Sequence, residues 1–310
     1  MGGVLQNFII QICYCAVPIF FIFSGYFSGK KTNYFSFMRK KFISVFLPYC
    51  IWMVLYFLYF NFGKLLIMKI SPTLIHNDSN IFFKWTITDW IHNFLGFAPV
   101  QNGDPWLAGQ FWFLRDLFCF SILFPFFVLT IKKIPYLWLV SVFIFSSLFT
   151  PLCNAHLFTS LFYFSLGIFF GHYDIDFFEI VDDFPFFQLG LLFIGTFILL
   201  IMLPNSLNYL STIEILITVM IILKMSKLSM NSVFLLYLSD YSLFLYLIHM
   251  PIIKIVVQKV WLHFFPMINT FFVLFEFFGA AICIIVVSTF IGICLKKVFP
   301  RIYSCLIGMR

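Results

Sequence analysis

The sequence predicts an all-α fold, a polytopic membrane helical bundle of about nine transmembrane helices that forms a single domain over residues 1–310. Of the 310 residues, 63% are hydrophobic and only 10% are charged. A soluble domain carries about 25% charged residues, so this chain cannot cover a water-facing surface. Nine apolar segments also approach the roughly 20 residues that a helix needs to cross a bilayer. These segments are residues 8–27, 42–62, 111–131, 135–152, 157–172, 186–203, 209–225, 240–260 and 271–295.

The loops between these segments differ in their content of Lys and Arg. Because cytoplasmic loops carry an excess of these residues, the sequence predicts an outside N-terminus and a cytoplasmic C-terminus in the cell inner (cytoplasmic) membrane. The net charge of +7 then reflects orientation in the lipid bilayer, and no nucleic-acid partner is expected. The cytoplasmic set is Lys30, Lys31, Arg39, Lys40, Lys41, Lys132, Lys133, Lys224, Lys227, Lys296, Lys297, Arg301 and Arg310, against Lys64, Lys69 and Lys84 outside.

Residues 173–185 are an exception, because this loop carries five carboxylates and no basic residue although alternation places it inside. Acidic residues contribute little to topology, so the assignment stands. The cluster could form a metal site, since carboxylate oxygens bind hard cations. A solvated acidic loop is the favoured interpretation, and no metal site is predicted. The five residues are Asp174, Asp176, Glu179, Asp182 and Asp183.

The long extracytoplasmic loop, residues 63–110, holds Trp85, Trp90 and Trp106 among several Asp and Asn residues. Aromatic rings beside polar groups suit sugars, which are apolar on one face and hydroxylated at their edges. Tryptophans are equally typical of the aromatic belt at a membrane interface. Both interpretations stay open, and Trp106 is a candidate acceptor-binding residue.

An apolar run from Val17 to Phe23 is broken at Ser24 and Gly25 and is followed by a basic cluster. An unpaired polar group in lipid costs several kcal/mol, so such a break normally lines a cavity or contacts a neighbouring helix. Small residues are also common where two membrane helices pack together. The break is therefore either the wall of a site or a packing notch.

Charged residues inside apolar segments are expensive, so they are candidates for function or for pairing. Arg115 and Asp116 are adjacent, and neighbours on a helix point about 100° apart, so we expect each to pair with another helix. Glu214, Glu276 and Asp240 are weaker candidates of the same kind.

His249 lies in another apolar segment, directly before Met250 and Pro251, where we expect a kink. An imidazole with a pKa near 6.5 could act as a general base or hydrogen-bond an acceptor hydroxyl. A core histidine whose hydrogen bonds are satisfied is the alternative.

Three stretches occur in order along the chain. The first is VPIFFIFSGYF (17–27), which a basic stretch connects to Leu47-Pro48-Tyr49. The second is GQFWFLRDLFCFSILFPFF (109–127), and the third is YSLFLYLIHMPII (241–253). Together they resemble the acyltransferase 3 family of integral-membrane acyltransferases, which includes O-acetylases of bacterial surface polysaccharides. The resemblance covers nearly the whole chain.

The resemblance implies transfer of an acetyl or other short acyl group from cytoplasmic acyl-CoA to a hydroxyl of a cell-surface glycan or lipid-linked saccharide. Acetyl-CoA would be a substrate, with no bound cofactor. His249 would be catalytic. The donor-binding residues would be Ser24, Gly25, Tyr26, Arg39, Lys40 and Lys41, and Trp112 would be an acceptor-binding or structural residue. Lys31 is added to the donor-binding set because it belongs to the same basic cluster. Trp106, Arg115 and Asp116 are further acceptor-binding or structural candidates, for the reasons given above.

The chain departs from the family at its start. Members normally begin with one more helix, which carries an arginine and a histidine thought to be the catalytic base. No residue here matches that histidine, so we expect a shortened or degraded copy with little activity, for which an accessory membrane role is an alternative. A transporter or flippase for a lipid-linked sugar is another alternative, but it would predict repeat symmetry that the sequence does not show.

Overall fold

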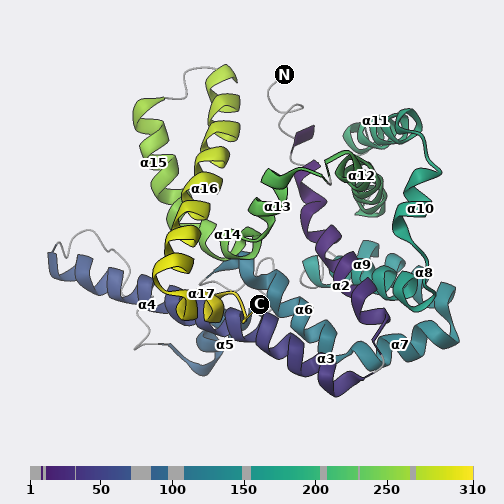
Figure 1. The fold of residues 1–310 in the computed structure, drawn as a ribbon, viewed down its shortest axis with the longest axis horizontal. Coiled ribbons are helices and arrows are strands. Elements are labelled where there is room, and N and C mark those ends of the chain that lie inside the picture. The colour runs from purple at the N-terminus through teal and green to yellow at the C-terminus, as the bar shows by residue number, and fades with distance from the viewer. Residues whose placement is uncertain are drawn as a thin grey trace. The chain divides into compact units, whose positions relative to one another are not determined.

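The computed structural model describes residues 8–9, 12–31, 33–70, 85–96, 108–148, 155–202, 208–229, 231–265 and 270–309. Their regular structure consists of helices, without strands, which confirms the predicted all-α class (Figure 1). The helices are α2 (Ala16–Gly29), α3 (Tyr34–Lys41), α4 (Leu47–Ile70), α5 (Ile87–Leu95), α6 (Trp112–Ile122), α7 (Phe124–Lys133), α8 (Pro135–Leu148), α9 (Ala155–His172), α10 (Phe177–Asp182), α11 (Phe186–Met202), α12 (Asn208–Ser229), α13 (Val233–Ser239), α14 (Ser242–Ile248), α15 (Lys254–Phe264), α16 (Thr270–Val298) and α17 (Pro300–Leu306), with the shorter turns η1 (Phe42–Phe46), η6 (Gly109–Phe111) and η7 (His249–Ile253).

Each predicted transmembrane segment contains helix in its described part, and several helices are long enough to cross a membrane. The third segment divides into α6 and α7, which meet at a bend of 63°. Pro125 near the start of α7 has no N–H to continue the helical ladder, which explains the bend. The helices of three other segments are shorter, at 10–17 residues. The long ones are Ile12–Gly29, Tyr34–Phe62, Ser242–Phe264 and Phe275–Val298.

The second segment begins earlier than the predicted residue 42, because the basic stretch before it is helical as α3. The backbone N–H of Ser36 donates to the Asn33 side chain at 3.1 Å, which satisfies one of the amides at the helix start. Lys and Arg are good helix formers, so nothing interrupts the helix before the apolar part. Pro48 then lacks an N–H, and the helix widens into the π-helical turn η1 just before it.

Contacts between Cα atoms divide the chain into two compact units, each built from separate stretches of sequence. The first unit contains the described residues up to Lys40 and those from Asp116 to Ser232. The second contains the described residues from Lys41 to Arg115 and those from Val233 onward. Helices α3 and α6 each contribute to both units, so the division does not cut the chain into consecutive domains.

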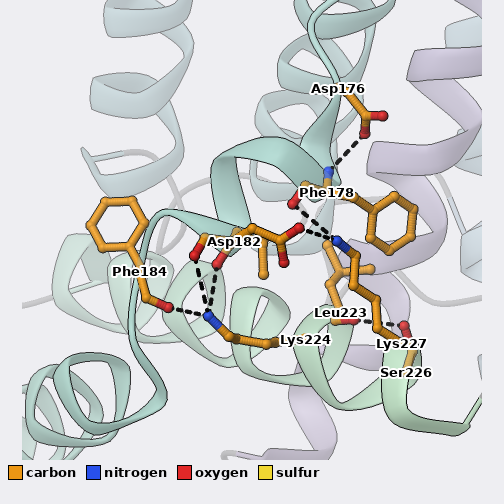
Figure 2. Close-up of polar contacts among 9 residues, drawn as sticks. Asp176, Phe178, Asp182, Phe184, Leu223, Lys224, Ser226 and Lys227 are labelled. Carbon is orange, nitrogen blue, oxygen red and sulfur yellow. Dashed lines mark hydrogen bonds and ion pairs between the residues drawn. The ribbon is translucent and has the colours of Figure 1, made fainter.

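In the first unit, the acidic segment 173–185 forms the short helix α10 with both of its ends satisfied (Figure 2). At the start of α10, the backbone N–H of Phe178 donates to Asp176 Oδ1 at 2.8 Å. At its end, Lys224 Nζ of α12 donates to the carbonyl oxygens of Val181 (3.3 Å) and Phe184. A cation at a helix C-terminus is favourable because the last carbonyl groups carry partial negative charge.

Two carboxylates of this acidic segment form ion pairs with lysines. Asp174 lies 2.8 Å from Lys30 Nζ, and Asp182 contacts Lys227 Nζ. Both lysines belong to the basic set assigned to the cytoplasmic side, so the segment lies on the same side of this unit as alternation requires. In the described part of the chain, no group of three or more His, Cys, Asp or Glu side chains is placed to hold a metal ion.

Candidate functional site

In the first unit, α2 and α9 pack backbone against backbone along a glycine seam. A Cβ built on Gly25 would lie 2.2 Å from the Phe164 carbonyl oxygen, and one on Gly167 would lie 2.0 Å from the Ile22 carbonyl oxygen. The other two glycines meet carbonyl oxygens in the same way, at 2.7 and 2.1 Å. No larger residue fits these positions without moving the opposite backbone. The glycine seam consists of Gly25 and Gly29 of α2 and Gly167 and Gly171 of α9.

The glycines of each helix are four residues apart, which is the spacing of small residues that lets membrane helices approach closely. A glycine hydrogen occupies the direction in which a Cβ would point, so each glycine aims a Cα–H at a carbonyl group of the other helix. Gly25 lies beside Gly167, and Gly29 lies beside Gly171, so the two helices are parallel. The predicted alternation requires the same direction for these two segments.

The break at Ser24 and Gly25 therefore has a structural role at Gly25, which fits the packing interpretation of this motif. The Ser24 carbonyl oxygen accepts a hydrogen bond from Ser28 Oγ at 2.6 Å. The Tyr26 ring lies against Phe177 of α10, with 5.8 Å between ring centroids. Donor binding by Ser24, Gly25 and Tyr26 stays a prediction.

Lys30 lies at the end of the seam, directly after Gly29. Its Nζ lies 4.6 Å from the centroid of the Tyr26 ring and 2.8 Å from the Asp174 carboxylate. The hydrogen bond to Asp174, followed by that to Tyr26, raises the pKa of Lys30 above its ordinary value. This lysine is thus already engaged by protein groups.

The other predicted donor-binding cations are placed differently. Lys31 is exposed just before α3, and Arg39 and Lys40 are exposed near its end. Lys41, the last residue of α3, is half-buried. Exposed guanidinium and ammonium groups on one short helix can reach an anionic ligand.

In the second unit, the helix of the third motif is interrupted after His249. Met250 has φ −118° and ψ 150°, which are not helical dihedral angles, so α14 and α15 are separate helices. Pro251 has no N–H to donate, and its ring excludes the preceding residue from the helical region. The predicted kink is confirmed.

Two side chains from elsewhere in the unit bind the carbonyl oxygens that the break leaves without helical partners. The Tyr56 hydroxyl of α4 lies 3.1 Å from the Leu247 oxygen and also contacts the Met250 oxygen. Gln110 Nε2 donates to the same Met250 oxygen at 2.7 Å. Irregular backbone inside a membrane requires such partners. We refer to Tyr56, Gln110, Tyr246, His249 and Met250 as the helix-break cluster.

The hydrogen bonds of His249 determine which of its ring nitrogens carries the proton. Nδ1 lies 2.8 Å from the Tyr246 carbonyl oxygen and 3.2 Å from that of Leu245. A carbonyl oxygen only accepts hydrogen bonds, so Nδ1 must carry the hydrogen. In the neutral ring the lone pair is then on Nε2, which is the nitrogen able to accept a proton. His249 is half-buried at this position.

The second motif packs onto the helix-break cluster through its aromatic residues. Phe111 is fully buried, and its ring centroid lies 5.5 Å from that of Tyr56 and 6.3 Å from that of Tyr246. Phe113 lies 5.8 Å from Tyr246, and the Tyr246 hydroxyl donates to the Gln110 carbonyl oxygen. Tyr49, from the Leu-Pro-Tyr element, lies 6.4 Å from Phe111. Three separate sequence elements therefore meet within this unit.

The remaining residues of the second motif occupy buried positions. Arg115 is 5% exposed and donates to the Leu95 carbonyl oxygen at the end of α5, so its predicted pairing with another helix is confirmed. Asp116 is fully buried, and Trp112 is half-buried. Acceptor binding by these residues stays a prediction, and Trp106 lies outside the described residues.

Part of the predicted long loop is instead helical and forms α5. Thr86 and Asp89 form a capping box at its start, in which the Thr86 backbone N–H donates to Asp89 Oδ2 at 2.8 Å and the Asp89 backbone N–H donates to Thr86 Oγ1 at 3.2 Å. Hydrogen bonds from the Thr86 side chain and then its backbone lower the pKa of Asp89. Trp90 packs on Trp85 and Phe57, at 5.0 and 5.4 Å. Trp85 and Trp90 thus pack against protein rings, and both interpretations of the loop stay predictions.

Tyr56 and Gln110 are the site residues that sequence reasoning missed. Gln110 had a usable signal, because it is an amide two residues before the Trp-Phe-Leu stretch (112–114) of the second motif. Tyr56 had none, since it is one of 14 tyrosines in a chain rich in aromatic residues.

Comparison with known proteins gives one match. A family model described as an acyltransferase domain, Acyl_transf_3, matches residues 2–295. Neither a search of curated proteins nor one of solved structures gives a match. The matched range includes the glycine seam, α3 and the whole helix-break cluster.

Proposed function

Because this chain belongs to the acyltransferase 3 family, we propose that it transfers an acyl group, in the first instance acetyl, from cytoplasmic acyl-CoA to a hydroxyl of a cell-surface glycan. The chain is a multi-pass membrane protein, so a donor and an acceptor on opposite sides of the bilayer can both reach it. The proposal also orients the chain with α3 and its basic residues towards the cytoplasm, in the inner membrane.

The observation that supports this proposal best is the state of His249 at the helix break. A sugar hydroxyl is a poor nucleophile at neutral pH, and a positioned base removes its proton as the new bond forms. Nδ1 of His249 is held by the Tyr246 carbonyl oxygen, so Nε2 is available for this role. Fixing one ring nitrogen so that the other can act as a base is the arrangement found in other acyl-transfer sites.

The reaction at this histidine would proceed as follows. The acceptor hydroxyl gives its proton to Nε2, and its oxygen bonds to the thioester carbonyl carbon. The carbon–sulfur bond then breaks, and the coenzyme A thiolate takes the proton from the imidazolium. The products are the O-acyl ester and the free thiol, and no net proton is consumed.

In this proposal, the basic residues in and next to α3 bind the acyl-CoA donor. Coenzyme A carries several phosphate charges, which Arg39 can contact in a bidentate manner and Lys31, Lys40 and Lys41 can attract as point charges. Their position at the proposed cytoplasmic end of the second transmembrane segment agrees with a cytoplasmic donor.

The test follows label from [¹⁴C]acetyl-CoA into glycan in membranes that contain the full chain. His249→Asn should lower turnover by about 10²–10⁴-fold, the usual contribution of a general base. His263→Asn is the matched control, because His263 is exposed on α15, beyond the break, and should retain activity.

Two outcomes would contradict the proposal. Equal activity of His249→Asn and His263→Asn would remove the role of His249 as base. Movement of an intact lipid-linked sugar across the bilayer without incorporation of label would instead identify the chain as a flippase.

A further inference from the structure

Glu214 of α12, in the first unit, has a carboxyl group that is enclosed by protein and has no hydrogen-bond partner in the described part of the chain. The residue is 1% exposed. Neither Oε1 nor Oε2 has a hydrogen-bond partner among the described residues. The carboxylates of Asp174 and Asp182 differ, since each is paired with a lysine. Glu214 therefore has none of the stabilisation that the other two receive.

Two buried hydroxyl groups in this part of the first unit bind backbone atoms. Thr218, one turn further along α12, donates its Oγ1 hydrogen to the Glu214 carbonyl oxygen at 2.8 Å. Tyr163 of α9 lies with its hydroxyl 3.4 Å from the Thr212 carbonyl oxygen. Both hydroxyl groups therefore donate to backbone carbonyl oxygens and not to the Glu214 carboxyl group.

The cationic groups of α12 are remote from Glu214. Lys224 lies ten residues further along the helix, which corresponds to about 15 Å, or half the hydrocarbon thickness of a bilayer. Lys224 and Lys227 already bind the carbonyl oxygens and carboxylate of the α10 segment (Figure 2).

Among the described side chains of the elements that contact α12, His172 of α9 is the one further group able to carry a positive charge. Helix α11, which packs most extensively on α12, has no titratable residue. His172 is the last residue of α9, at the same end of the unit as Lys30 and Asp174. The titratable side chains described on the contacting elements are Tyr26 (α2), Tyr136 (α8), Tyr163 and His172 (α9), and Glu179 and Asp182 (α10), besides Lys224 and Lys227 of α12 itself.

An ionised carboxylate in such surroundings is far more costly than a neutral one. Moving an isolated charge out of water costs tens of kcal/mol in the simplest treatment, and a buried carboxyl group without a cation becomes protonated instead. Titratable residues within membrane segments commonly bind or relay protons. We propose that Glu214 is a proton-binding site inside the first unit and that its carboxyl group carries a proton at neutral pH.

The test uses N,N′-dicyclohexylcarbodiimide, an apolar reagent that adds to protonated carboxyl groups in membrane interiors. The acid proton moves to one nitrogen of the reagent, and the carboxyl oxygen bonds to its central carbon. Rearrangement then gives a stable N-acylurea with no leaving group, so the protein gains the mass of one whole reagent molecule. The full-length protein in liposomes is treated at neutral pH and at alkaline pH, and the adduct is located by peptide mass mapping.

We expect the adduct at Glu214 at neutral pH, a lower yield as the pH rises, and no adduct at this position in Glu214→Gln. Glu179→Gln is the matched control, because Glu179 is an exposed carboxylate of the same unit and its removal should not change the labelling. The mapping on the unaltered protein is decisive even if Glu214→Gln fails to fold. No adduct at Glu214, or a yield there that does not fall with rising pH, would overturn the proposal.

Discussion

The glycine seam of the first unit and the helix-break cluster of the second are two ways to join helices inside a membrane. In the seam, α2 and α9 meet through backbone atoms, and the absence of side chains is what permits the contact. In the cluster, the backbone of one helix is broken, and side chains from Tyr56 and Gln110 bind the carbonyl oxygens that the break leaves.

The difference shows which property each region depends on. The seam depends on volume, because the opposite backbone lies where any Cβ would be and a carbonyl group of a helix cannot move aside. The cluster depends on hydrogen bonding, because a buried carbonyl oxygen without a donor carries a desolvation penalty. One added methyl group should therefore be enough to separate the two helices of the seam. In the cluster, each hydrogen bond that is removed should lower stability by only a part of the total.

The largest effect should come from Gly167→Ala. Its Cβ would lie 2.0 Å from the Ile22 carbonyl oxygen, so the two helices must separate. Overpacking typically costs about 1–3 kcal/mol, and contact with backbone places this variant at about 3 kcal/mol or more. Thermal unfolding in detergent measures the loss.

The matched control for this variant is Gly195→Ala. A Cβ at Gly195 of α11 would have no neighbour within 4 Å. Alanine is a better helix former than glycine by about 1 kcal/mol, so this change should be neutral or stabilising. If both variants lose similar stability, the glycine seam does not hold the first unit together.

A smaller effect is expected in the helix-break cluster. Tyr56→Phe and Gln110→Ala should each cost about 1 kcal/mol, because each leaves a carbonyl oxygen with one donor fewer. Both side chains bind the Met250 oxygen, so the double variant should not show the sum of the two losses. Tyr59→Phe and Gln188→Ala, at exposed positions, serve as controls.

Turnover of the same variants shows whether Tyr56 and Gln110 only stabilise the fold or also position His249 for the reaction. If the cluster positions His249, turnover should fall while KM for acetyl-CoA stays constant. Additive losses of stability, together with unchanged turnover, would show that the two side chains act independently and only structurally.

The smallest effect concerns the ion pair that ends the seam. Asp174 raises the pKa of Lys30, so the pair contributes its stabilisation at neutral pH and loses it only above the ordinary pKa of lysine, near 10.4. Asp174→Asn should leave the unfolding temperature almost unchanged, because both side chains are partly exposed and screened by salt. It should raise the rate at which Lys30 is acylated by an amine-reactive ester.

Lys132 provides the reference rate for this measurement, because it is exposed and remote in sequence from Asp174. Equal reactivity of Lys30 and Lys132 in the unaltered protein would show that the ion pair does not form in solution.

The parts of the fold that could be predicted from the sequence are those with a local cause. Apolar length located the helical segments, and Pro251 located the break after His249. The basic stretch before residue 42 is helical although its charge predicts the boundary of a transmembrane segment, because Lys and Arg continue a helix well.

The partners could not be predicted, because they depend on contacts between distant stretches. Ser24 and Gly25 marked one side of the seam, but nothing in the sequence links them to Gly167 and Gly171. In the same way, the break at Met250 predicts that carbonyl oxygens need donors, without showing that Tyr56 and Gln110 supply them. The roles of the donor-binding residues stay predictions for the acetyl-transfer test.

The parallel pairing of α2 and α9 has a consequence for synthesis of the chain. The residues between Gly29 and Ala155 must be made before α9 can reach α2, which takes about 6–25 s at ordinary rates of translation. During this interval the glycine face of α2 has no partner from α9. The α2–α9 contact thus forms only after the fifth predicted segment of the chain, residues 157–172, has been made. A chain whose synthesis stops earlier leaves α2 in the bilayer with its glycine face exposed to other helices.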